Sequence, residues 1–426
     1  MAESLNLMSN MNRVETPFIT AKIGQYNFGA YEKNNREQGV DQYGAYRING
    51  IRYPNFVTNL DITKINGQVN KYTLSLIYTV RETDDPNFFE KVFSTVSQSR
   101  KIIFSYGDMQ IPNYCFREEE AMITDVKTSF NINQNSINYT VYAISSANLL
   151  DVGTYPYFPG RKNTKPSDVI KELLTNSAFN LLDIFTGMRN GTTLNGIPLI
   201  PDNDLPTTIE SKTNMSVLDY LKYLVSSMKP VESSGVLNNP FIIIFGDDTS
   251  GELMGPYFKI VQTNSNVKET EAYTLDIGFP GQVFVTDFRV ENNETYSIYY
   301  DYQSQLHPEE YVQRLNNRGE IEEVYAPIIS SGNETYHTRE DDKTWWSKVT
   351  SYPIKCSVTV KGLLKPVILM SYVKLNVLFF GKKHIASGLY IVTKQQDSVG
   401  MSGYRTTLNM VKVAGDDEFL WYKAQC

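Results

Sequence analysis

Histidines are the side chains in this sequence that could bind a metal ion or exchange protons near neutral pH. There are three of them: His307, His337 and His384. None lies among cysteines or acidic residues at the spacing of metal ligands, which a zinc site requires. The sequence therefore predicts no metal site and no cofactor.

Carboxylates are the second group that could do chemistry. Asp247 and Asp248, with Glu252, could bind a cation, but a Gly-bounded acidic turn between two strands is typical of a solvated loop. Glu309 and Glu310 look like a catalytic pair, although acidic residues at the start of a helix more often interact with the helix dipole. We interpret neither group as an active site.

Local catalytic motifs are missing from the sequence. It contains no Gly-rich phosphate loop with its Lys and Ser/Thr, and no G-x-S-x-G, H-E-x-x-H or C-x-x-C motif. We therefore expect a protein that is not an enzyme. A glycosidase stays open as an alternative, because two carboxylates on a β-rich scaffold leave no local motif.

An aromatic pair is the most conspicuous candidate for a contact with another protein. Trp345 and Trp346 are adjacent and are flanked by Lys343 and Lys348 in a polar stretch. Tryptophan is enriched at the centres of protein interfaces. We expect one of the two indoles in a core and name both as the candidate partner contact.

Composition and charge exclude several classes of protein. The chain has 426 residues, 12% of them aromatic, and a formal net charge of -7, so it has no general field for binding nucleic acid. Its three cysteines, an odd number, are too widely spaced for a disulfide framework. Residues 1–12 lack the pattern of a signal peptide, and no stretch reaches the roughly 18 apolar residues of a membrane helix. We expect a protein made in a cytoplasm.

The elements that must position these residues are mainly strands, and their pattern occurs twice. The period-two alternation of half-buried antiparallel strands, with Gly, Asn and Ser turns, marks them. The first copy comprises strands at 72–80, 101–106, 121–130 and 137–144, and the second copy comprises strands at 354–361, 373–380, 388–394 and 404–413. In the second copy a turn is expected at 398–403. This order predicts an internal duplication.

Helices are expected at four places. Proline at the first helical position and apolar residues at helical spacing predict helices at 85–96 and 166–177, and a Ser or Asn cap predicts one at 216–228. Two strands at 241–245 and 257–261 follow, so that a small α/β module separates the two copies. A further helix is expected at 308–315, in a charged excursion.

The sequence thus predicts an α+β fold dominated by β-structure. We expect three domains: a first β-domain at 1–154, a small α/β module at 155–265, and a second β-domain at 266–426 with the charged excursion at 303–350. Two similar units in one chain can occupy equivalent places in a ring.

Several stretches of the second unit form a recognisable set: the strand from Phe284 to Tyr302, the residues from Trp345 to Pro353, the strand from Ser357 to Gly362, and the strands that begin at Gly388 and Tyr404. With these stretches the chain resembles bacteriophage baseplate hub proteins, and the resemblance covers both β-units. The hubs of contractile-tailed phages and the hub half of VgrG spike proteins have this arrangement. The resemblance implies two tube-protein-like antiparallel β-barrels with the α/β module between them.

It also implies a role and a set of partners. Such a hub is a homotrimer that forms a pseudo-sixfold ring in the virion, with the tail tube or its initiator protein above, the central spike below and the baseplate wedge beside it. Genome DNA passes through the channel without sequence recognition, and acidic groups are expected to face it. Two alternatives stay open: a receptor- or carbohydrate-binding tail protein, and a tail-associated cell-wall hydrolase.

Overall fold

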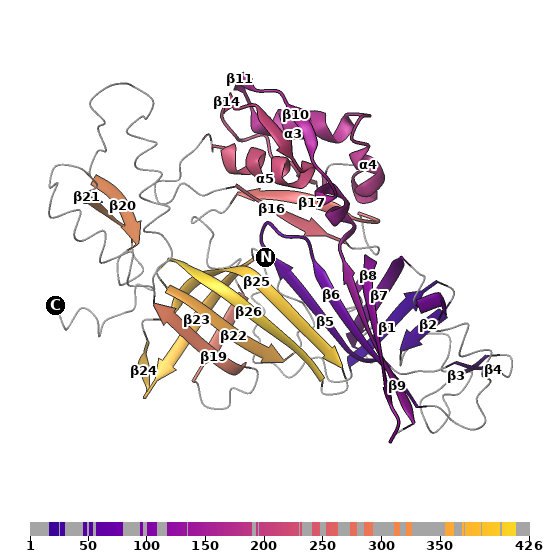
Figure 1. Cartoon of the computed structure of the whole chain (residues 1–426). Coiled ribbons are helices and arrows are strands. Elements are labelled where there is room, and N and C mark those ends of the chain that lie inside the picture. The colour runs from indigo at the N-terminus through magenta and orange to yellow at the C-terminus, as the bar shows by residue number, and fades with distance from the viewer. Residues whose placement is uncertain are drawn as a thin grey trace.

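The structure is a computed structural model of the 426-residue chain. It describes residues 17–24, 26–29, 46–48, 51–53, 57–79, 94–96, 100–108, 117–133, 135–189, 193–194, 196–229, 231, 241–247, 253–262, 273–278, 285–292, 311–315, 321–325, 354–361, 369, 371–384, 386–400 and 403–414. Two β-units lie side by side, and an α/β module lies across them (Figure 1).

The first β-unit contains the strands of the N-terminal part of the chain. These strands are β1 (Pro17–Ile23), β2 (Tyr26–Gly29), β3 (Tyr46–Ile48), β4 (Ile51–Tyr53), β5 (Val57–Ile65), β6 (Lys71–Thr79), β7 (Lys101–Asp108), β8 (Arg117–Asn131) and β9 (Ser136–Ile144). Alternation selects the buried face: on β6, Tyr72, Leu74 and Leu76 are at most 1% exposed, while their neighbours face outward. Of the helix expected at 85–96, residues 94–96 are helical and Val96 is buried, whereas 85–93 lie outside the described residues.

The second β-unit contains the remaining long strands. They are β18 (Tyr273–Ile277), β19 (Val285–Asn292), β22 (Ile354–Lys361), β23 (Tyr372–Phe379), β24 (Lys382–Lys383), β25 (Gly388–Gly400) and β26 (Gly403–Ala414). Both β25 and β26 run into the region where a turn was expected at 398–403, so the turn between them is shorter than predicted. A separate hairpin consists of β20 (Tyr311–Leu315) and β21 (Ile321–Tyr325).

That hairpin shows that the helix expected at 308–315 is wrong. Tyr and Val favour a strand at least as well as a helix, and the partner strand β21 supplies the backbone hydrogen bonds. Pairing with the adjacent strand β21, in which Leu315 lies opposite Ile321, overrides the weak helical preference here.

The α/β module contains the helices. Its elements are η3 (Ser146–Asp151), β10 (Tyr155–Phe158), β11 (Arg161–Thr164), α3 (Pro166–Thr175), α4 (Leu181–Ile184), η4 (Thr186–Met188), β12 (Thr193–Leu194), β13 (Ile197–Pro198), β14 (Thr207–Ile209), β15 (Lys212–Met215), α5 (Val217–Ser227), β16 (Phe241–Gly246) and β17 (Tyr257–Gln262). Both predicted helices are confirmed: Pro166 opens α3, and the Ser216 side chain accepts a hydrogen bond from the Asp219 N–H to cap α5. Their apolar faces bury Ile170 and Leu221 in the module's core.

One hydrogen-bonded sheet joins the two β-units. Its order is β19-β22-β26-β25-β5-β6-β9-β8-β7-β1-β2, with β23 paired to β25 and β18 paired to β23. Described neighbours run antiparallel, apart from the parallel pair β18 and β23. The fold is therefore α+β and dominated by antiparallel sheet, as predicted from the sequence.

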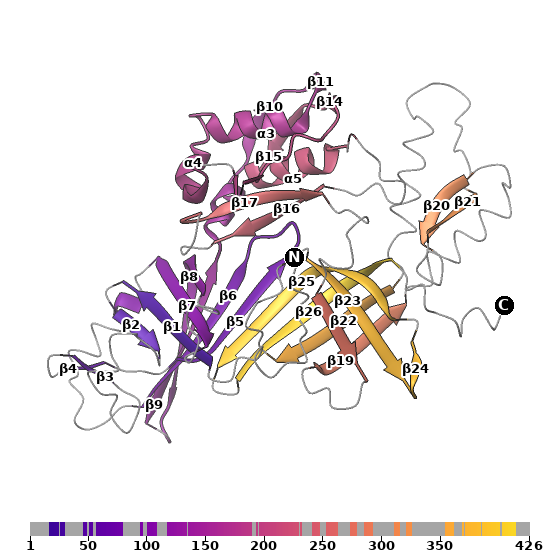
Figure 2. The ribbon, with the colours of Figure 1, turned by 180° about the vertical axis from the view of Figure 1, so that it is seen from behind.

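The link between the units is the pairing of β25 with β5, which lie side by side in both views (Figure 1 and Figure 2). The N-terminal part of β25, 388–391, pairs with β23, whereas 394–400 pairs with β5. Val399 and Tyr404 of the second unit accordingly belong to the core of the first. The module is tied to both, since the Gly67 N–H donates to the Ile243 carbonyl at 3.1 Å and Ile244 packs in the second unit's core.

Candidate functional site

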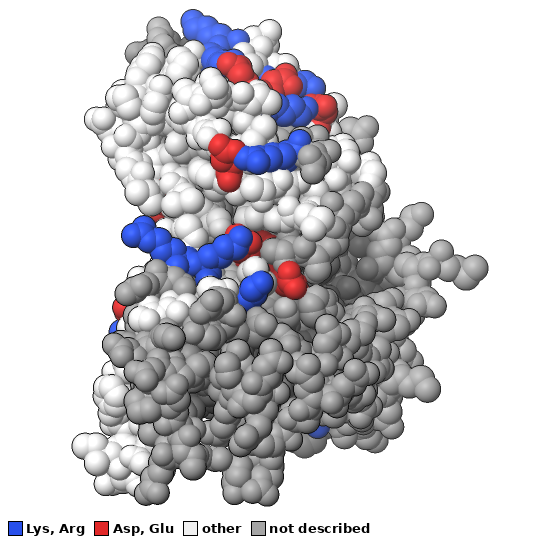
Figure 3. All heavy atoms as spheres, turned by 90° about the vertical axis from the view of Figure 1, so that its right-hand side faces the viewer, with Lys and Arg blue, Asp and Glu red and all other residues white. Residues whose placement is uncertain are grey.

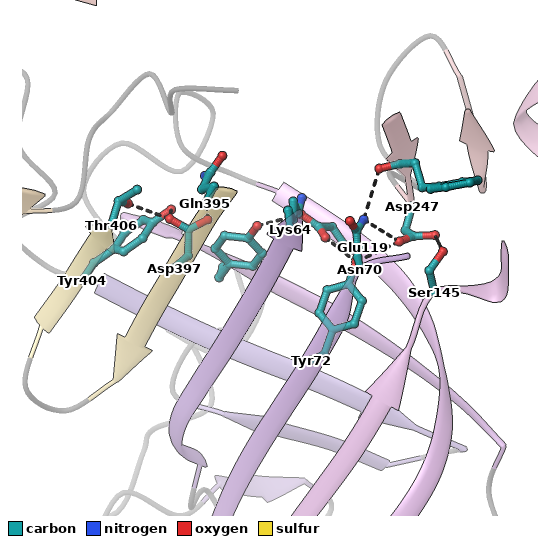
Figure 4. Close-up of polar contacts among 12 residues, drawn as sticks. Lys64, Asn70, Tyr72, Glu119, Ser145, Asp247, Gln395, Asp397, Tyr404 and Thr406 are labelled. Atoms are coloured by element: carbon teal, nitrogen blue, oxygen red, sulfur yellow. Dashed lines mark hydrogen bonds and ion pairs between the residues drawn. The ribbon is translucent and has the colours of Figure 1, made fainter. Parts of the chain in front are cut away.

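A buried cluster of polar side chains lies where the module meets the first β-unit. Tyr72 is on β6, Glu119 on β8 and Ser145 caps η3, while Asp247 directly follows β16 (Figure 4). Glu119 is 0% and Asp247 is 1% exposed. On the outside of this junction, charged side chains gather in a band between the module and the unit below it (Figure 3).

Two carboxyl groups in this cluster share a tyrosine hydroxyl. Tyr72 Oη lies 2.6 Å from Glu119 Oε2 and 3.0 Å from Asp247 Oδ2. Glu119 also accepts from the Tyr106 hydroxyl at 2.7 Å and from Lys64 Nζ at 2.6 Å. A phenol carries one proton, so Tyr72 can donate to only one carboxylate at a time. The second contact is a hydrogen bond only when that carboxyl is itself protonated.

In this cluster the pKa of Asp247 is raised, so this carboxyl carries a proton when the pH lies below about 6. Burial raises the pKa of Asp247 to about 6, and hydrogen bonds from Ser145, Asn70 and Tyr72 only partly oppose that rise, to which the charge of Glu119 adds. Ser145 Oγ donates to Asp247 Oδ1 at 2.5 Å and Asn70 Nδ2 donates to Oδ2 at 2.8 Å. In the described part of the chain no lysine or arginine forms an ion pair with Asp247.

The same cluster corrects one expectation from the sequence. Asp247 does not lie in a solvated loop, because its neighbours Asn70, Tyr72 and Ser145 come from distant parts of the chain and enclose it. Asp248 and Glu252 lie outside the described residues. Within the described ranges, no group of three His, Cys, Asp or Glu residues is arranged to hold a metal ion.

A second buried cluster lies nearby on the second unit. Asp397 accepts from Gln395 Nε2 at 2.8 Å and from Thr406 Oγ1 at 2.6 Å (Figure 4). The rings of Tyr404 and Tyr106 meet edge to face, with centroids 6.3 Å apart. Both clusters therefore border the place where β25 joins β5, and neither offers its carboxylates to solvent.

The opposite side of the joined sheet carries an open polar surface, which we call the polar face. It is formed by the outward side chains of β19, β22, β26, β25, β5, β6, β9 and β8. One row of directly opposed residues consists of Asp287, Thr359, Thr407, Gln396, Thr63 and Lys71, and the next row consists of Lys361, Arg405, Ser398, Asp61, Thr73 and Tyr142. A hollow of about 670 Å³ lies on this face, over β19, β22, β26 and β25.

The remaining predicted residues are placed as follows. Trp345 and Trp346, like His307, His337, Glu309 and Glu310, lie outside the described residues. His384 is half-buried, and its Nδ1 accepts from the Ala386 N–H at 3.1 Å; burial lowers its pKa. No described helix is long and apolar enough to cross a membrane.

Glu119 was missed by reasoning from the sequence, although a signal was present. It is the middle residue of Glu118-Glu119-Glu120, and the buried Ala121 lies two positions further along β8. Period-two alternation places residues 119 and 121 on the same face. An acidic residue on a buried face requires donors, and that requirement predicts a polar cluster.

Comparison with known proteins identifies similar structures but no similar sequences. No family model matches the chain, and no curated protein matches it. A tail protein from Neisseria meningitidis MC58 has a TM-score of 0.51 at 9% identity, covering 93% of this chain and 96% of that one. The 43 kDa tail protein of prophage MuSo2 from Shewanella oneidensis has a TM-score of 0.48 at 12% identity, with 93% and 98% covered.

A component of the type VI secretion system from E. coli also matches, with a TM-score of 0.46 at 10% identity over 87% of this chain and 78% of that one. At these identities the likeness concerns the fold, which is that of a tail protein over nearly the whole chain. The resemblance to tail proteins is thus confirmed at the level of the fold.

Proposed function

We propose, on the basis of this shared fold, that the chain is the structural baseplate hub of a phage tail. Three copies form a ring with pseudo-sixfold symmetry, which joins the tail tube to the central spike and lets DNA pass. The protein works in the virion, where the tube or its initiator lies above the ring, the spike below it and wedge proteins beside it. It carries out no catalysis.

The observation that carries this proposal is the duplicated strand order within one continuous sheet. The first unit has the order β5-β6-β9-β8-β7-β1, and the second has β19-β22-β26-β25-β23-β18. Three chains would therefore supply six equivalent units. Because β25 already pairs with β5, neighbouring units in such a ring share a sheet rather than meeting through loops.

The polar face suits the wall of a water-filled channel. Its first row contains Thr63, Thr359, Thr407 and Gln396, which are neutral and present hydroxyl and amide groups. Neutral groups of this kind stay hydrated and give a sliding polyanion no strong site to bind. The apolar face of the same sheet is already covered by the cores of the two units.

The acidic channel lining expected from the sequence finds no support on this face. Its two rows carry Lys71, Lys361 and Arg405 against Asp61 and Asp287. Basic groups attract phosphates, and salt weakens that attraction. The hollow on this face adds Arg289, Lys355 and Lys394 against Glu291. We propose instead a channel wall of neutral groups with interspersed charges of both signs.

A hydrolase is the weaker alternative, because the closest candidates for a carboxylate pair are enclosed. Glu119 and Asp247 are held by Tyr72 at the junction of two parts of the molecule, at 0% and 1% exposure. A glycosidase needs its two carboxyls on either side of a bound sugar. We propose that this pair stabilises the junction.

The test is the solution mass, measured by light scattering on the protein alone and with its candidate spike protein. One chain has a mass of 48.6 kDa, and the proposal predicts a species of three times that mass in at least one condition. A monomer in both conditions that binds cell-wall polysaccharide would instead favour the receptor-binding alternative.

A further inference from the structure

The two β-units correspond residue by residue, well beyond their strand order. In each unit one long strand carries a bulge at a threonine, Thr124 on β8 and Thr393 on β25. A second bulge occurs at Thr58 on β5 and Thr286 on β19, and each of these hydroxyls donates to a carbonyl of the next strand, at 3.0 and 3.1 Å. These matches define which residues are equivalent.

By this equivalence β8 corresponds to β25, and β19 corresponds to β5. Within the chain, 394–400 of β25 pairs antiparallel with β5, with Gln396 opposite Thr63 and Val399 opposite Leu60. We call this pairing the internal seam. The equivalent pairs are Lys127 with Glu291 and Phe130 with Phe288.

The edges that would make the equivalent contact have no strand partner among the described residues. Among the described residues, 125–130 of β8 pair only with β9, and β19 pairs only with β22. Val399, in the internal seam, is fully buried, whereas the equivalent Phe130 is 69% exposed. An open edge with an exposed aromatic side chain is a site for pairing with another chain.

The charges on the two open edges are complementary. Lys127 is exposed, with its Nζ 5.0 Å from the Tyr142 ring centroid, and Glu291 is exposed on β19. The neighbouring Arg289 is already paired with Asp287 at 3.1 Å. In the part of the chain that the structure describes, neither Lys127 nor Glu291 has an ion-pair partner.

We propose that residues 125–130 of β8 pair antiparallel with β19 of a second copy of this chain, in the register of the internal seam. Lys127 then lies opposite Glu291, and Phe130 lies opposite Phe288 and is covered by the second unit of the neighbour. The pairing ends at Phe130, because the next equivalent position is Gly400, where a Cβ would lie 2.5 Å from the Thr58 carbonyl oxygen, and β8 has Asn131 there.

The contact joins different edges, so it is head to tail and generates a ring or a helix of copies. Closure at three copies rests on the proposed function. The seam between copies rests on the duplication alone.

The test is a disulfide between copies. Cys115 and Cys426 are replaced by Ser, Cys356 is left because it is buried, and Lys127→Cys and Glu291→Cys are introduced together. Directly opposed strand residues have the Cα spacing that a disulfide requires. Within one chain the two positions lie seven strands apart, roughly 30 Å at the usual spacing, so a disulfide between them must join two chains.

We expect oxidation of the double variant to give covalent oligomers. The single variants Lys127→Cys and Glu291→Cys should each stay uncrosslinked alone and give only dimers when mixed. Dimers of Lys127→Cys alone would overturn the proposal, because they would show a symmetric contact.

Charge-reversal variants test the same contact between copies by a second, independent measurement of assembly. Lys127→Glu or Glu291→Lys should weaken each seam by about tenfold, and the two together should restore it, because opposed charges across a strand pair attract and like charges repel. Arg405→Glu, on the same polar face but on an inner strand, is the control and should assemble normally.

The outcomes separate this inference from the proposed function. A trimer that forms no disulfide and is unaffected by either reversal would overturn the seam and leave the hub intact. Disulfide-linked rings or chains of another size would support the seam and overturn the trimeric hub. A chain that neither assembles nor crosslinks would overturn both.

Discussion

At the scale of single residues, the two enclosed carboxyl groups differ in their partners. Lys64, 14% exposed, pairs with Glu119, while Asp247 is surrounded by neutral donors. Burying an unpaired charge is costly, so Asp247 takes up a proton more readily than an exposed aspartate does. Below about pH 6 the hydroxyl of Tyr72 lies between the Glu119 carboxyl and a protonated Asp247.

This proton makes stability depend on pH in a defined direction. The pKa of Asp247 is about 6 in the folded chain, against 3.8 ordinarily, so folding favours the protonated form. Protonated Asp247 contributes its full stabilisation of the fold below the ordinary pKa of 3.8, and that stabilisation is lost as the pH rises through about 6. The whole effect on the unfolding free energy is on the order of 3 kcal/mol. Between about pH 5 and about pH 7.5, the wild type should lose about 1 kcal/mol relative to Asp247→Asn. Urea unfolding of the wild type and of Asp247→Asn at each pH measures their difference in unfolding free energy. If that difference were the same at both pH values, the raised pKa of Asp247 would be contradicted.

The shared hydroxyl gives a second expected outcome. Tyr72→Phe keeps the ring that stacks on Phe104 but removes the donor between Glu119 and Asp247, and should cost about 1–3 kcal/mol of unfolding free energy. The control is Tyr142→Phe, on the polar face, which should change the unfolding free energy by less than about 0.5 kcal/mol. If the two variants lowered the unfolding free energy equally, the buried polar cluster would not contribute to stability.

At the scale of elements, β25 belongs to both units. It pairs with β23 over 388–391 and with β5 over 394–400, and the bulge at Thr393 separates the two stretches. A bulge increases the local twist, which allows one strand to leave one sheet edge and join another. The two units therefore share strand β25.

Substitutions on opposite faces of β25 should therefore have very different effects. Val399→Asp places a charge in the core of the first unit and should cost several kcal/mol, whereas Gln396→Asp, three residues away on the polar face, should be tolerated. Thermal unfolding of both variants gives the comparison. If Val399→Asp were as stable as Gln396→Asp, the facing of β25 would be wrong.

At the scale of the whole molecule, the three parts are interlocked. In the turn after β5, the Asn66 N–H donates to the Thr393 carbonyl of the second unit at 3.1 Å, and the Gly67 N–H donates to the Ile243 carbonyl of the module. Each core also contains residues that the sequence assigned to another domain, such as Val69 and Leu150 in the core of the module. The boundaries after residues 154 and 265 stay predictions, but the parts they separate share their cores.

Assembly should be visible in amide hydrogen exchange. If copies join through β8 and β19, backbone amides in 125–130 and 288–292 should become protected by roughly tenfold or more in the assembled fraction. Residues 394–400, which already pair with β5, should be protected equally with and without assembly. Protection gained elsewhere but not on these two edges would place the contact on another surface.

Much of the local structure could be predicted because it depends on short-range patterns. The alternation in β6 and β22, the proline that opens α3 and the Ser216 cap of α5 act over a few residues, and all four elements are found where expected. The helix expected at 308–315 was wrong for the complementary reason. A strand partner outside the window decided the conformation.

The candidate site was less accessible to prediction. Asp247 resembles any acidic residue in a Gly-bounded turn, and its burial depends on Asn70, Tyr72 and Ser145, which are more than a hundred positions away. Glu119 could have been suspected from alternation, but its partners could not. The hydrogen-bond donors that surround a buried carboxylate come from separate elements, and the packing of the chain brings them together.

Periodicity and caps depend on residues that are close along the chain, and they are enough to predict a β-dominated, duplicated chain with an α/β module between its two halves. The pairing of β25 with β5, the single sheet that joins both units, and the absence of a described partner strand along 125–130 and β19 all depend on tertiary packing. Strand pairing is made by backbone groups that are the same in every residue, so its partners follow from the packing of the whole chain.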